Sequence, residues 1–327
     1  MISAVELEPS IAARVKESGA HFVVTGATGW FGKALLDALT HALGEESKER
    51  LHAFASRENA VELMDGTTVP VRPLQEINAL PQQHRYFVFH LAFLTKDKQS
   101  AMPLEEYAER NRAIRTQVGE ALGRLNVSGL CVTSSGAVYT KERTLNRDLE
   151  AYPYAALKVE EEEYFTRLCA GRIPLIIPRI FNMSGPYINK WDAYALSSLL
   201  QMAMRGEPLI IKARHPVIRS YVYVGDIINV VTGWLLQTQP ETLIFDVSSS
   251  ETIEIGELAE RICQLTGRDS SAIIRDYNPS LPADRYRGEG EVFGEMCRRA
   301  FLSSEAQMNL TYQYMRPLIG ILSVEPS

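Results

Sequence analysis

The chain has 327 residues, of which 46% are hydrophobic and 23% charged, and its formal net charge is −6 at pH 7. This length allows a large core and exceeds that of one ordinary domain, so we expect a main domain with a smaller lobe. The acidic balance argues against a nucleic-acid-binding surface, and no segment offers the roughly 18 uninterrupted apolar residues that a membrane helix needs. Neither nucleic acid nor a membrane is therefore an expected partner.

The cysteines are widely spaced, with no C-x-x-C pair and no histidine at metal-ligand spacing. This pattern suits small core thiols in a reducing cytoplasm and predicts neither a disulfide nor a metal site. The four residues are Cys131, Cys169, Cys263 and Cys297.

The first predicted strand, Phe22 to Thr25, is a short apolar run that stops at a turn with three glycines. A helix follows from about Trp30, so phosphates of a dinucleotide could bind N–H groups at its start. The spacing is G-x-x-G-x-x-G rather than the common G-x-G-x-x-G, and such triplets also occur without a ligand. The residues expected around the dinucleotide are Gly26, Thr28, Gly29, Trp30, Phe31 and Gly32.

The second predicted strand, Leu51 to Ala55, ends where side chains select the cofactor. An acid there binds the ribose 2′-hydroxyl of NAD, whereas a basic residue accommodates the 2′-phosphate of NADP. Ser56 and Arg57 occupy this place, so NADP(H) is favoured over NAD(H). Two alternatives remain: Glu58 is the ribose acid, or Arg57 is a solvated surface charge.

Further strands are predicted at residues 69–71, 86–91 and 130–133, with a long helix from 103 to 125. Strands and helices alternate and no hairpin signal interrupts them. The expected fold is α/β, a Rossmann-type doubly wound parallel sheet whose ligands lie at the carboxyl ends of the strands.

Tyr154 and Lys158 are one helical turn apart, which places a phenol and an ammonium on the same helix face. They follow a loop that begins with Ser134 and Ser135.

Seven motifs in this order resemble the signatures of the extended short-chain dehydrogenase/reductases, the nucleotide-sugar epimerase/dehydratase family. They are TGATGWFG (25–32), HLA (90–92), Asn111 with Thr116, SSGAVY (134–139), YAALK (154–158), PRIFNMSGP (178–186) and RSYVYVGD (219–226).

The resemblance implies a Rossmann domain over residues 1–181, joined by about 220–248, and a substrate-binding lobe over 182–219 and 249–327. It also implies a homodimer formed through the helices at 103–125 and 153–168.

The resemblance further implies that Tyr154 exchanges a proton with a substrate hydroxyl or ketone while a hydride moves to or from nicotinamide. A free phenol titrates near pH 10, and the ammonium of Lys158, together with the positive nicotinamide ring of the oxidised complex, is expected to lower this pKa. Ser135 matches the hydroxyl that binds the reacting oxygen, with Ser134 as the register alternative. The family pattern adds Leu91, Ala92 and Asn111 to the cofactor site, the last as a buried structural asparagine rather than a surface residue.

In the expected substrate lobe, Asn182 matches the asparagine that meets nucleotide-sugar phosphates, and Arg219 matches the arginine that neutralises one of them. Arg285 and Arg287 are candidates for a second phosphate contact, and the sequence does not choose between them.

The chain departs from the family at Gly136 and Ala137, where 4,6-dehydratases carry an Asp-Glu pair and related decarboxylases also place an acid. Without a second acid/base pair, elimination of water is disfavoured. Cysteine-dependent epimerisation is disfavoured as well, because the family's cysteine position is Gly136.

The expected function is therefore NADP(H)-dependent reduction of a nucleotide-linked 4-keto (deoxy)sugar. The alternatives are a nucleotide-sugar 4-epimerase with tightly bound NAD and, from another class, a dinucleotide-binding sensor without turnover.

Overall fold

The structure, a computed structural model, describes residues 5–237, 241–297 and 302–319. The chain forms two compact units, one of residues 4–180 and 228–246, the other of residues 181–227 and 247–327. The sequence placed the return to the first unit at about residue 220. In the structure it comes at residue 228, because Val222 and Tyr223 pair with Met183 and Ser184 of the smaller unit.

The larger unit contains, in the described part of the chain, a nine-stranded sheet with the order β13-β8-β6-β5-β1-β2-β4-β3 and with β7 paired to β8. The pairs that join β1, β2, β4, β5, β6 and β8 are all parallel. The strands are β1 (His21–Thr25), β2 (Leu51–Ala55), β3 (Asn59–Glu62), β4 (Thr68–Pro73), β5 (Arg85–His90), β6 (Asn126–Val132), β7 (Ser134–Ser135), β8 (Leu175–Ile180) and β13 (Thr242–Val247).

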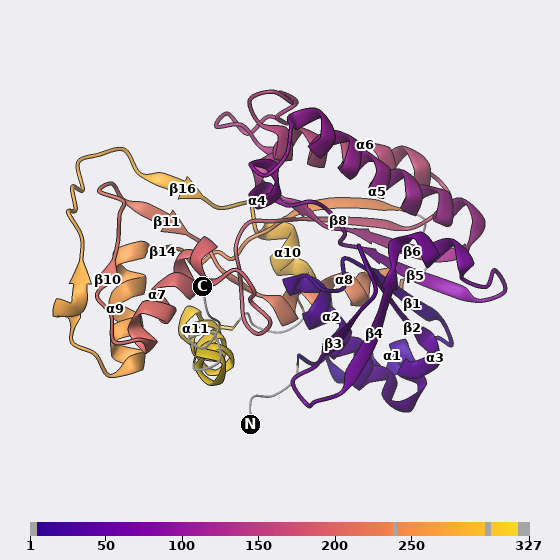
Figure 1. Ribbon diagram of the computed structural model, residues 1–327, viewed down its shortest axis with the longest axis horizontal. Coiled ribbons are helices and arrows are strands. Elements are labelled where there is room, and N and C mark those ends of the chain that lie inside the picture. The colour runs from indigo at the N-terminus through magenta and orange to yellow at the C-terminus, as the bar shows by residue number, and fades with distance from the viewer. Residues whose placement is uncertain (1–4, 238–240, 298–301, 320–327) are drawn as a thin grey trace. The chain divides into compact units, whose positions relative to one another are not determined.

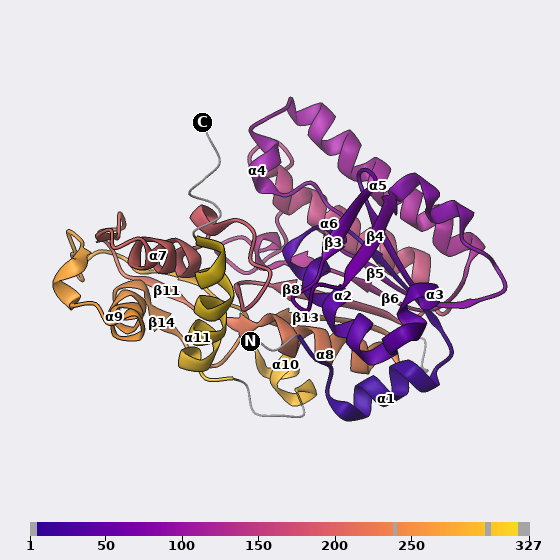
Figure 2. The ribbon, with the colours of Figure 1, turned by 60° about the horizontal axis from the view of Figure 1, so that its bottom comes forward.

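Helices cover both faces of this sheet. Helices α5 and α6 lie side by side on one face (Figure 1), and α1 packs against α2 on the other (Figure 2). The doubly wound parallel sheet expected from the sequence is thereby confirmed. The helices are α1 (Pro9–Glu17), α2 (Trp30–Leu43), α3 (Ser47–Arg50), α4 (Lys96–Gln99), α5 (Leu104–Arg124), α6 (Pro153–Cys169) and α8 (Val224–Leu235), the last of which runs across the boundary between the two units.

The central strands are apolar along nearly their whole length because both faces are covered. All of Phe22, Val23 and Val24 in β1 are at most 1% exposed. Successive side chains point to opposite faces, so Val23 joins the cluster under α5 and α6. This double burial explains why the strands lack polar alternation.

The expectation of a sheet without hairpins is wrong at one edge. Strand β3 pairs antiparallel with β4, with Asn59 opposite Val71 and Glu62 opposite Thr68. The hairpin lies at the edge of the sheet, where only Val61 of β3 is buried. Its sequence therefore shows little apolar signal, and its turn contains Asp65-Gly66.

The smaller unit is built from short strand pairs and helices. Strand β11 lies between β14 and β16, β10 pairs with β15, and β12 pairs with β9. Helix α7 packs against α9 and α11. The elements are β9 (Met183–Ser184), β10 (Leu209–Ile210), β11 (Val217–Arg219), β12 (Val222–Tyr223), β14 (Ile253–Glu254), β15 (Ile273–Ile274), β16 (Asp284–Tyr286), α7 (Ala195–Met204), α9 (Ile255–Thr266), α10 (Glu291–Met296) and α11 (Ser304–Met315).

None of the helices in the described ranges has the length and apolar character needed to cross a membrane. Within the same ranges no group of three or more His, Cys, Asp or Glu residues is arranged to hold a metal ion.

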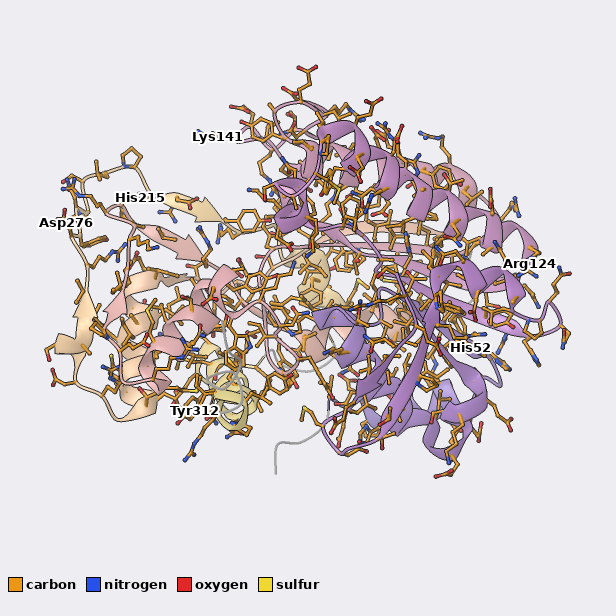
Figure 3. All side chains as sticks on the ribbon, in the orientation of Figure 1. His52, Arg124, Lys141, His215, Asp276 and Tyr312 are labelled. Atoms are coloured by element: carbon orange, nitrogen blue, oxygen red, sulfur yellow. The ribbon has the colours of Figure 1, made fainter. Side chains whose placement is uncertain are left out.

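Three histidines gather at the amino ends of the central strands. The ring of His21 stacks on that of His84 at 4.0 Å, and His21 Nδ1 lies 2.9 Å from His52 Nε2. Burial, followed by the neighbouring His21, lowers the pKa of His52 from the ordinary value of 6.5 to about 4. His52 lies on β2 of the larger unit (Figure 3).

This cluster predicts a loss of stability in acid. Because the folded-state pKa of His52 lies below the unfolded value, the unfolded chain binds more protons as the pH falls, and stability decreases from about pH 6.5 to pH 4. In His52→Asn the decrease in melting temperature over this range should be smaller than in the wild type by a few degrees. Thermal unfolding at several pH values measures the difference. His215→Asn, a change in the other unit (Figure 3), is the control, and a His52→Asn curve parallel to the wild-type curve would contradict the assignment.

Candidate active site

The glycine turn after β1 is the most tightly constrained segment of the site. Gly26 has φ +67°, and a Cβ added to it would lie 2.7 Å from the backbone nitrogen of Ala92 and from the carbonyl carbon of Leu91. A Cβ on Gly32 would lie 2.4 Å from the carbonyl oxygen of Gly26. Gly26 therefore lets the chain turn against the loop after β5, and Gly32 lets α2 start directly beside the turn.

Helix α2 begins at Trp30 with Gly29 as its N-cap, no side chain caps it, and its first turn contains no acidic residue. A Cβ on Gly29 would lie 3.3 Å from the carbonyl oxygen of Gly26, so the turn is packed closely at this position too. The positive end of the helix dipole and the N–H groups of the first turn suit an anionic group there. The residues of this turn therefore fit the pyrophosphate of a dinucleotide, with the backbone of Thr28, Trp30 and Phe31 beside it.

Thr25 joins the end of β1 to the end of β5. Its hydroxyl oxygen accepts the N–H groups of Leu91 and Ala92 at 3.2 and 3.3 Å, and lies 2.8 Å from His90 Nδ1. These bonds hold Leu91 and Ala92, which are expected to border the cofactor, beside the glycine turn.

The end of β2 is open to solvent. Ser56, Arg57 and Glu58 follow Ala55 directly and are all exposed. Both the basic side chain of Arg57 and the acidic side chain of Glu58 are therefore accessible at this strand end.

The three residues expected to be catalytic include a hydrogen-bonded pair. Tyr154 and Lys158 lie on α6, and the hydroxyl of Ser135 is hydrogen-bonded to that of Tyr154. Ser134 is buried and donates to Glu162 Oε1 at 2.5 Å. The geometry therefore favours Ser135 over Ser134 as the hydroxyl beside Tyr154.

Lys158 is buried among three groups. Its ammonium donates to the carbonyl oxygen of Thr133 and to Glu161 Oε2, both at 2.8 Å, and lies 3.9 Å from the ring centroid of Phe93. The ring of Phe93 also meets that of Tyr154 edge to face at 5.6 Å.

The pKa of Tyr154 differs from the expectation. Burial raises it above the ordinary value of 10, the hydrogen bond with Ser135 opposes this rise, and the negative charge of Glu161 adds to it. Lys158, which was expected to lower this pKa, is not among the groups that shift it in the structure.

Asn111 is 3% exposed and bridges α5 to the loop after β5. Its Oδ1 accepts the N–H of Leu94 at 2.8 Å, and its Nδ2 donates to the carbonyl oxygen of Tyr107 at 3.1 Å. Both contacts are to backbone atoms, so the amide orders this loop, as a buried structural asparagine would.

Arg219, in the smaller unit, is engaged with an acid. Its guanidinium donates to Asp284 Oδ2 at 2.7 Å and also to the carbonyl oxygens of Ile218 and Asp284, at 3.0 and 3.2 Å. A phosphate would therefore compete with this carboxylate for the guanidinium.

Asn182 lies just after β8 and ties two neighbouring strand ends together. Its Nδ2 donates to the carbonyl oxygens of Ser220 and Tyr286, at 3.0 and 3.3 Å. It lies close to the residue that follows Arg219, within one unit.

The two alternative arginines, Arg285 and Arg287, are placed by the short strand β16. In the parallel pairing of β11 with β16, Arg285 is opposite Ile218, whereas Arg219 is opposite Tyr286. Since side chains alternate along a strand, Arg285 and Arg219 are on opposite faces of this small sheet.

Sequence reasoning missed the roles of Glu161 and Asp284. Glu161 is three residues after Lys158 on the same helix, a spacing that brings side chains together. That spacing could have predicted the contact of Glu161 with Lys158. The contact of Asp284 with Arg219 joins positions 65 residues apart, and no local pattern in the sequence predicts it.

A parallel sheet covered by helices on both faces, with a glycine turn between β1 and α2, defines a Rossmann-type fold. The sequence matches the NAD dependent epimerase/dehydratase family over residues 22–247, and the chain belongs to this family of NAD-dependent enzymes. UDP-glucuronic acid decarboxylase 6 of Arabidopsis thaliana is 24% identical to it over 299 residues, which cover 82% of this chain and 81% of the plant protein.

Two solved structures show the same fold. The Bordetella bronchiseptica enzyme WbmF in complex with NAD⁺ matches with a TM-score of 0.72 and 17% identity, over 93% of this chain and 95% of WbmF. The Thermus thermophilus UDP-glucose 4-epimerase complex with NAD matches with a TM-score of 0.68 and 20% identity, over 90% of this chain and 99% of the epimerase.

The close contact at Gly26 predicts a specific sensitivity to substitution. Gly19 has a similar φ of +61° but nothing within 4 Å of an added Cβ, so Gly19→Ala should cost only the roughly 1–2 kcal/mol of left-handed backbone. Gly26→Ala should lose more, because its methyl group meets backbone atoms that cannot move aside. Urea unfolding of the two variants measures the difference, and equal losses would mean that the turn is not packed as described.

Proposed function

We propose that this enzyme reduces a nucleotide-linked 4-keto (deoxy)sugar with NADPH. The observation that carries the choice of cofactor and direction is the pair Ser56 and Arg57, exposed immediately after β2. A basic side chain at this place suits a 2′-phosphate. Selecting the cofactor that cells keep reduced makes sense chiefly for net reduction of a ketone.

The chemistry of the loop after β6 supports simple reduction over elimination. Its positions 136 and 137 are Gly and Ala, which offer no acid or base. Although a decarboxylase is among the curated relatives, the loop lacks the acid that the decarboxylases of this family place there.

The proposed reaction uses one proton donor from the chain. A nicotinamide cofactor held at the glycine turn would supply the hydride for the ketone carbon. Tyr154 donates its hydroxyl proton to the ketone oxygen, and Ser135 holds that oxygen by a hydrogen bond. Burial raises the pKa of Tyr154 above its ordinary value, so the phenol carries its proton at neutral pH.

The smaller unit supplies the proposed contacts to the substrate diphosphate. Arg219 suits a phosphate because its guanidinium is a permanently charged, forked donor, and Asn182 lies close by in the same unit. Arg285 and Arg287, on either side of Tyr286, are both candidates for a second contact. We also propose a cytoplasmic homodimer formed through α5 and α6.

Arg57 provides the test of cofactor choice. Arg57→Ala should weaken NADPH binding by roughly 1.5–3 kcal/mol, the range for a hydrogen bond to a charged group, and leave NADH binding nearly unchanged. Binding is measured by fluorescence titration of both cofactors. Glu58→Ala is the matched variant: it should change neither affinity, and a selective loss of NADH binding in Glu58→Ala would assign the ribose contact to the acid instead.

The reaction itself separates a reductase from an epimerase. Because a reductase must exchange its cofactor at each turnover, the protein should purify largely without cofactor and consume NADPH stoichiometrically with a nucleotide-linked 4-keto-6-deoxyhexose. Absorbance and NMR of the product follow the reaction, in parallel with nucleotide hexoses plus catalytic NAD⁺.

Tyr154→Phe should lower turnover by about 10²–10⁴-fold, whereas Tyr152→Phe, which changes a side chain 58% exposed, should not.

Conversion of a hexose to its 4-epimer without net NADPH loss would instead identify an epimerase, as would stoichiometric NAD retained through purification. Binding of the dinucleotide with no turnover of either substrate class would identify a sensor.

A further inference from the structure

Glu161 is a buried acid beside the proposed catalytic lysine. Its exposed fraction is 2% and that of Lys158 is 5%. Glu161 Oε2 accepts a hydrogen bond from Lys158 Nζ at 2.8 Å, and Oε1 faces His90 Nε2 at 3.3 Å. Neither Oε1 nor that His90 nitrogen has a hydrogen-bond partner elsewhere in the described part of the chain.

The hydrogen bonds around Thr25 orient the ring of His90. The hydroxyl oxygen of Thr25 accepts the N–H groups of Leu91 and Ala92. The hydroxyl hydrogen of Thr25 is then available to His90 Nδ1, which lies 2.8 Å away. In the neutral ring that accepts this bond at Nδ1, the ring hydrogen is on Nε2 and points toward Glu161. The carboxylate of Glu161 therefore lies between the ammonium of Lys158 and the ring of His90.

This arrangement changes what Lys158 does for Tyr154. A lone ammonium near a phenol favours the phenolate, and so favours a tyrosine that accepts a proton. A carboxylate 2.8 Å from that ammonium cancels most of its field at longer range. The neutral phenol of the tyrosine is then favoured over the phenolate.

We propose that Glu161 is a positioning residue that neutralises Lys158 and holds it against the carbonyl of Thr133, and so keeps Tyr154 in its phenol form up to a higher pH. This role deepens the proposed function and rests on it for the assignment of Tyr154 as the proton donor. The effect on Tyr154 itself can be measured without any substrate.

The other groups around Tyr154 do not supply this effect. Ser135 is neutral and stabilises the phenolate by its hydrogen bond, Phe93 presents the edge-to-face contact of an apolar ring, and Tyr107 of α5 is neutral at the working pH. The titratable or charged groups that face it are therefore Lys158, Glu161 with His90 behind it, and Tyr107. Burial first, and then Glu161, raise the pKa of Tyr154.

The decisive experiment titrates Tyr154 in the cofactor-free protein. Tyrosinate absorbance is recorded against pH for the wild type and for Glu161→Gln, and in each case the curve of the same protein carrying Tyr154→Phe is subtracted. In Glu161→Gln the midpoint should fall by at least about half a pH unit, roughly a threefold gain in the phenolate fraction at a given pH below the midpoint. An unchanged midpoint would overturn the role of Glu161.

Two further variants guard against a merely structural effect. Glu160→Gln is the matched control, because Glu160 pairs on the helix surface with Arg112 at 2.7 Å, and its midpoint should equal that of the wild type. Glu161→Asp keeps the charge and should keep the midpoint high. Should Glu161→Gln not fold, Glu161→Ala supplies the same loss of charge with a smaller side chain and the same expected shift.

Kinetics distinguish a failure of this role from a failure of the proposed function. With the keto sugar and NADPH, kcat in Glu161→Gln should decline at a lower pH on the basic side than in the wild type, and Glu161→Asp should restore the profile. A lowered Tyr154 midpoint supports the role of Glu161 even if no keto sugar is turned over. The role of Glu161 would be refuted if the enzyme reduces the keto sugar but Glu161→Gln changes neither the Tyr154 midpoint nor the basic side of the kcat profile. The proposed reductase function would still stand in that case.

Discussion

The larger unit depends on the close approach of three backbone segments at Gly26. The end of β1, the loop after β5 and the start of α2 meet there at distances that exclude even a methyl group. Thr25 strengthens the same junction through its hydroxyl, which accepts two N–H groups of the neighbouring loop. In a parallel sheet, the loops that follow the strands all lie at the same edge. This junction therefore also fixes where the side chains of the later loops lie.

Helix α6 contributes a second constraint, because it buries two consecutive carboxylates against the sheet. Glu161 meets Lys158 and His90, whereas Glu162 accepts from both the guanidinium of Arg179 and the hydroxyl of Ser134. A buried charge is tolerated only when such partners satisfy it. The two networks fix α6 against β5 and β8, and so set the positions of Tyr154 and Ser135.

The family of this enzyme includes several reactions on one scaffold, so residues rather than fold must argue the chemistry. In this chain the loop beside Ser135 has no acid at positions 136 and 137, while the acid next to Lys158 is buried and paired. In the proposed reaction the buried acid acts on Tyr154 through Lys158, and positions 136 and 137 offer no acid or base to remove a proton from a sugar carbon. This distribution is what connects the proposed reduction to the proposed role of Glu161.

The sequence by itself determined the parallel sheet, the glycine turn and the pairing of Tyr154 with Lys158 on one helix face. Each depends on local signals: continuous apolar runs in buried strands, glycines where no Cβ fits, and a spacing of four residues along a helix. The sequence did not predict the edge hairpin of β3 and β4, because an exposed strand has little apolar pattern.

Only the tertiary structure decided which serine meets Tyr154, what surrounds Lys158 and which acid engages Arg219. Ser134 and Ser135 are adjacent in sequence but point to different partners, since successive side chains of an extended segment alternate. His90 and Glu161 are 71 positions apart, and Arg219 and Asp284 are 65 apart. Such contacts arise from strand order and helix packing, and the charge state of a buried group follows from all its neighbours together, which no local pattern in the sequence contains.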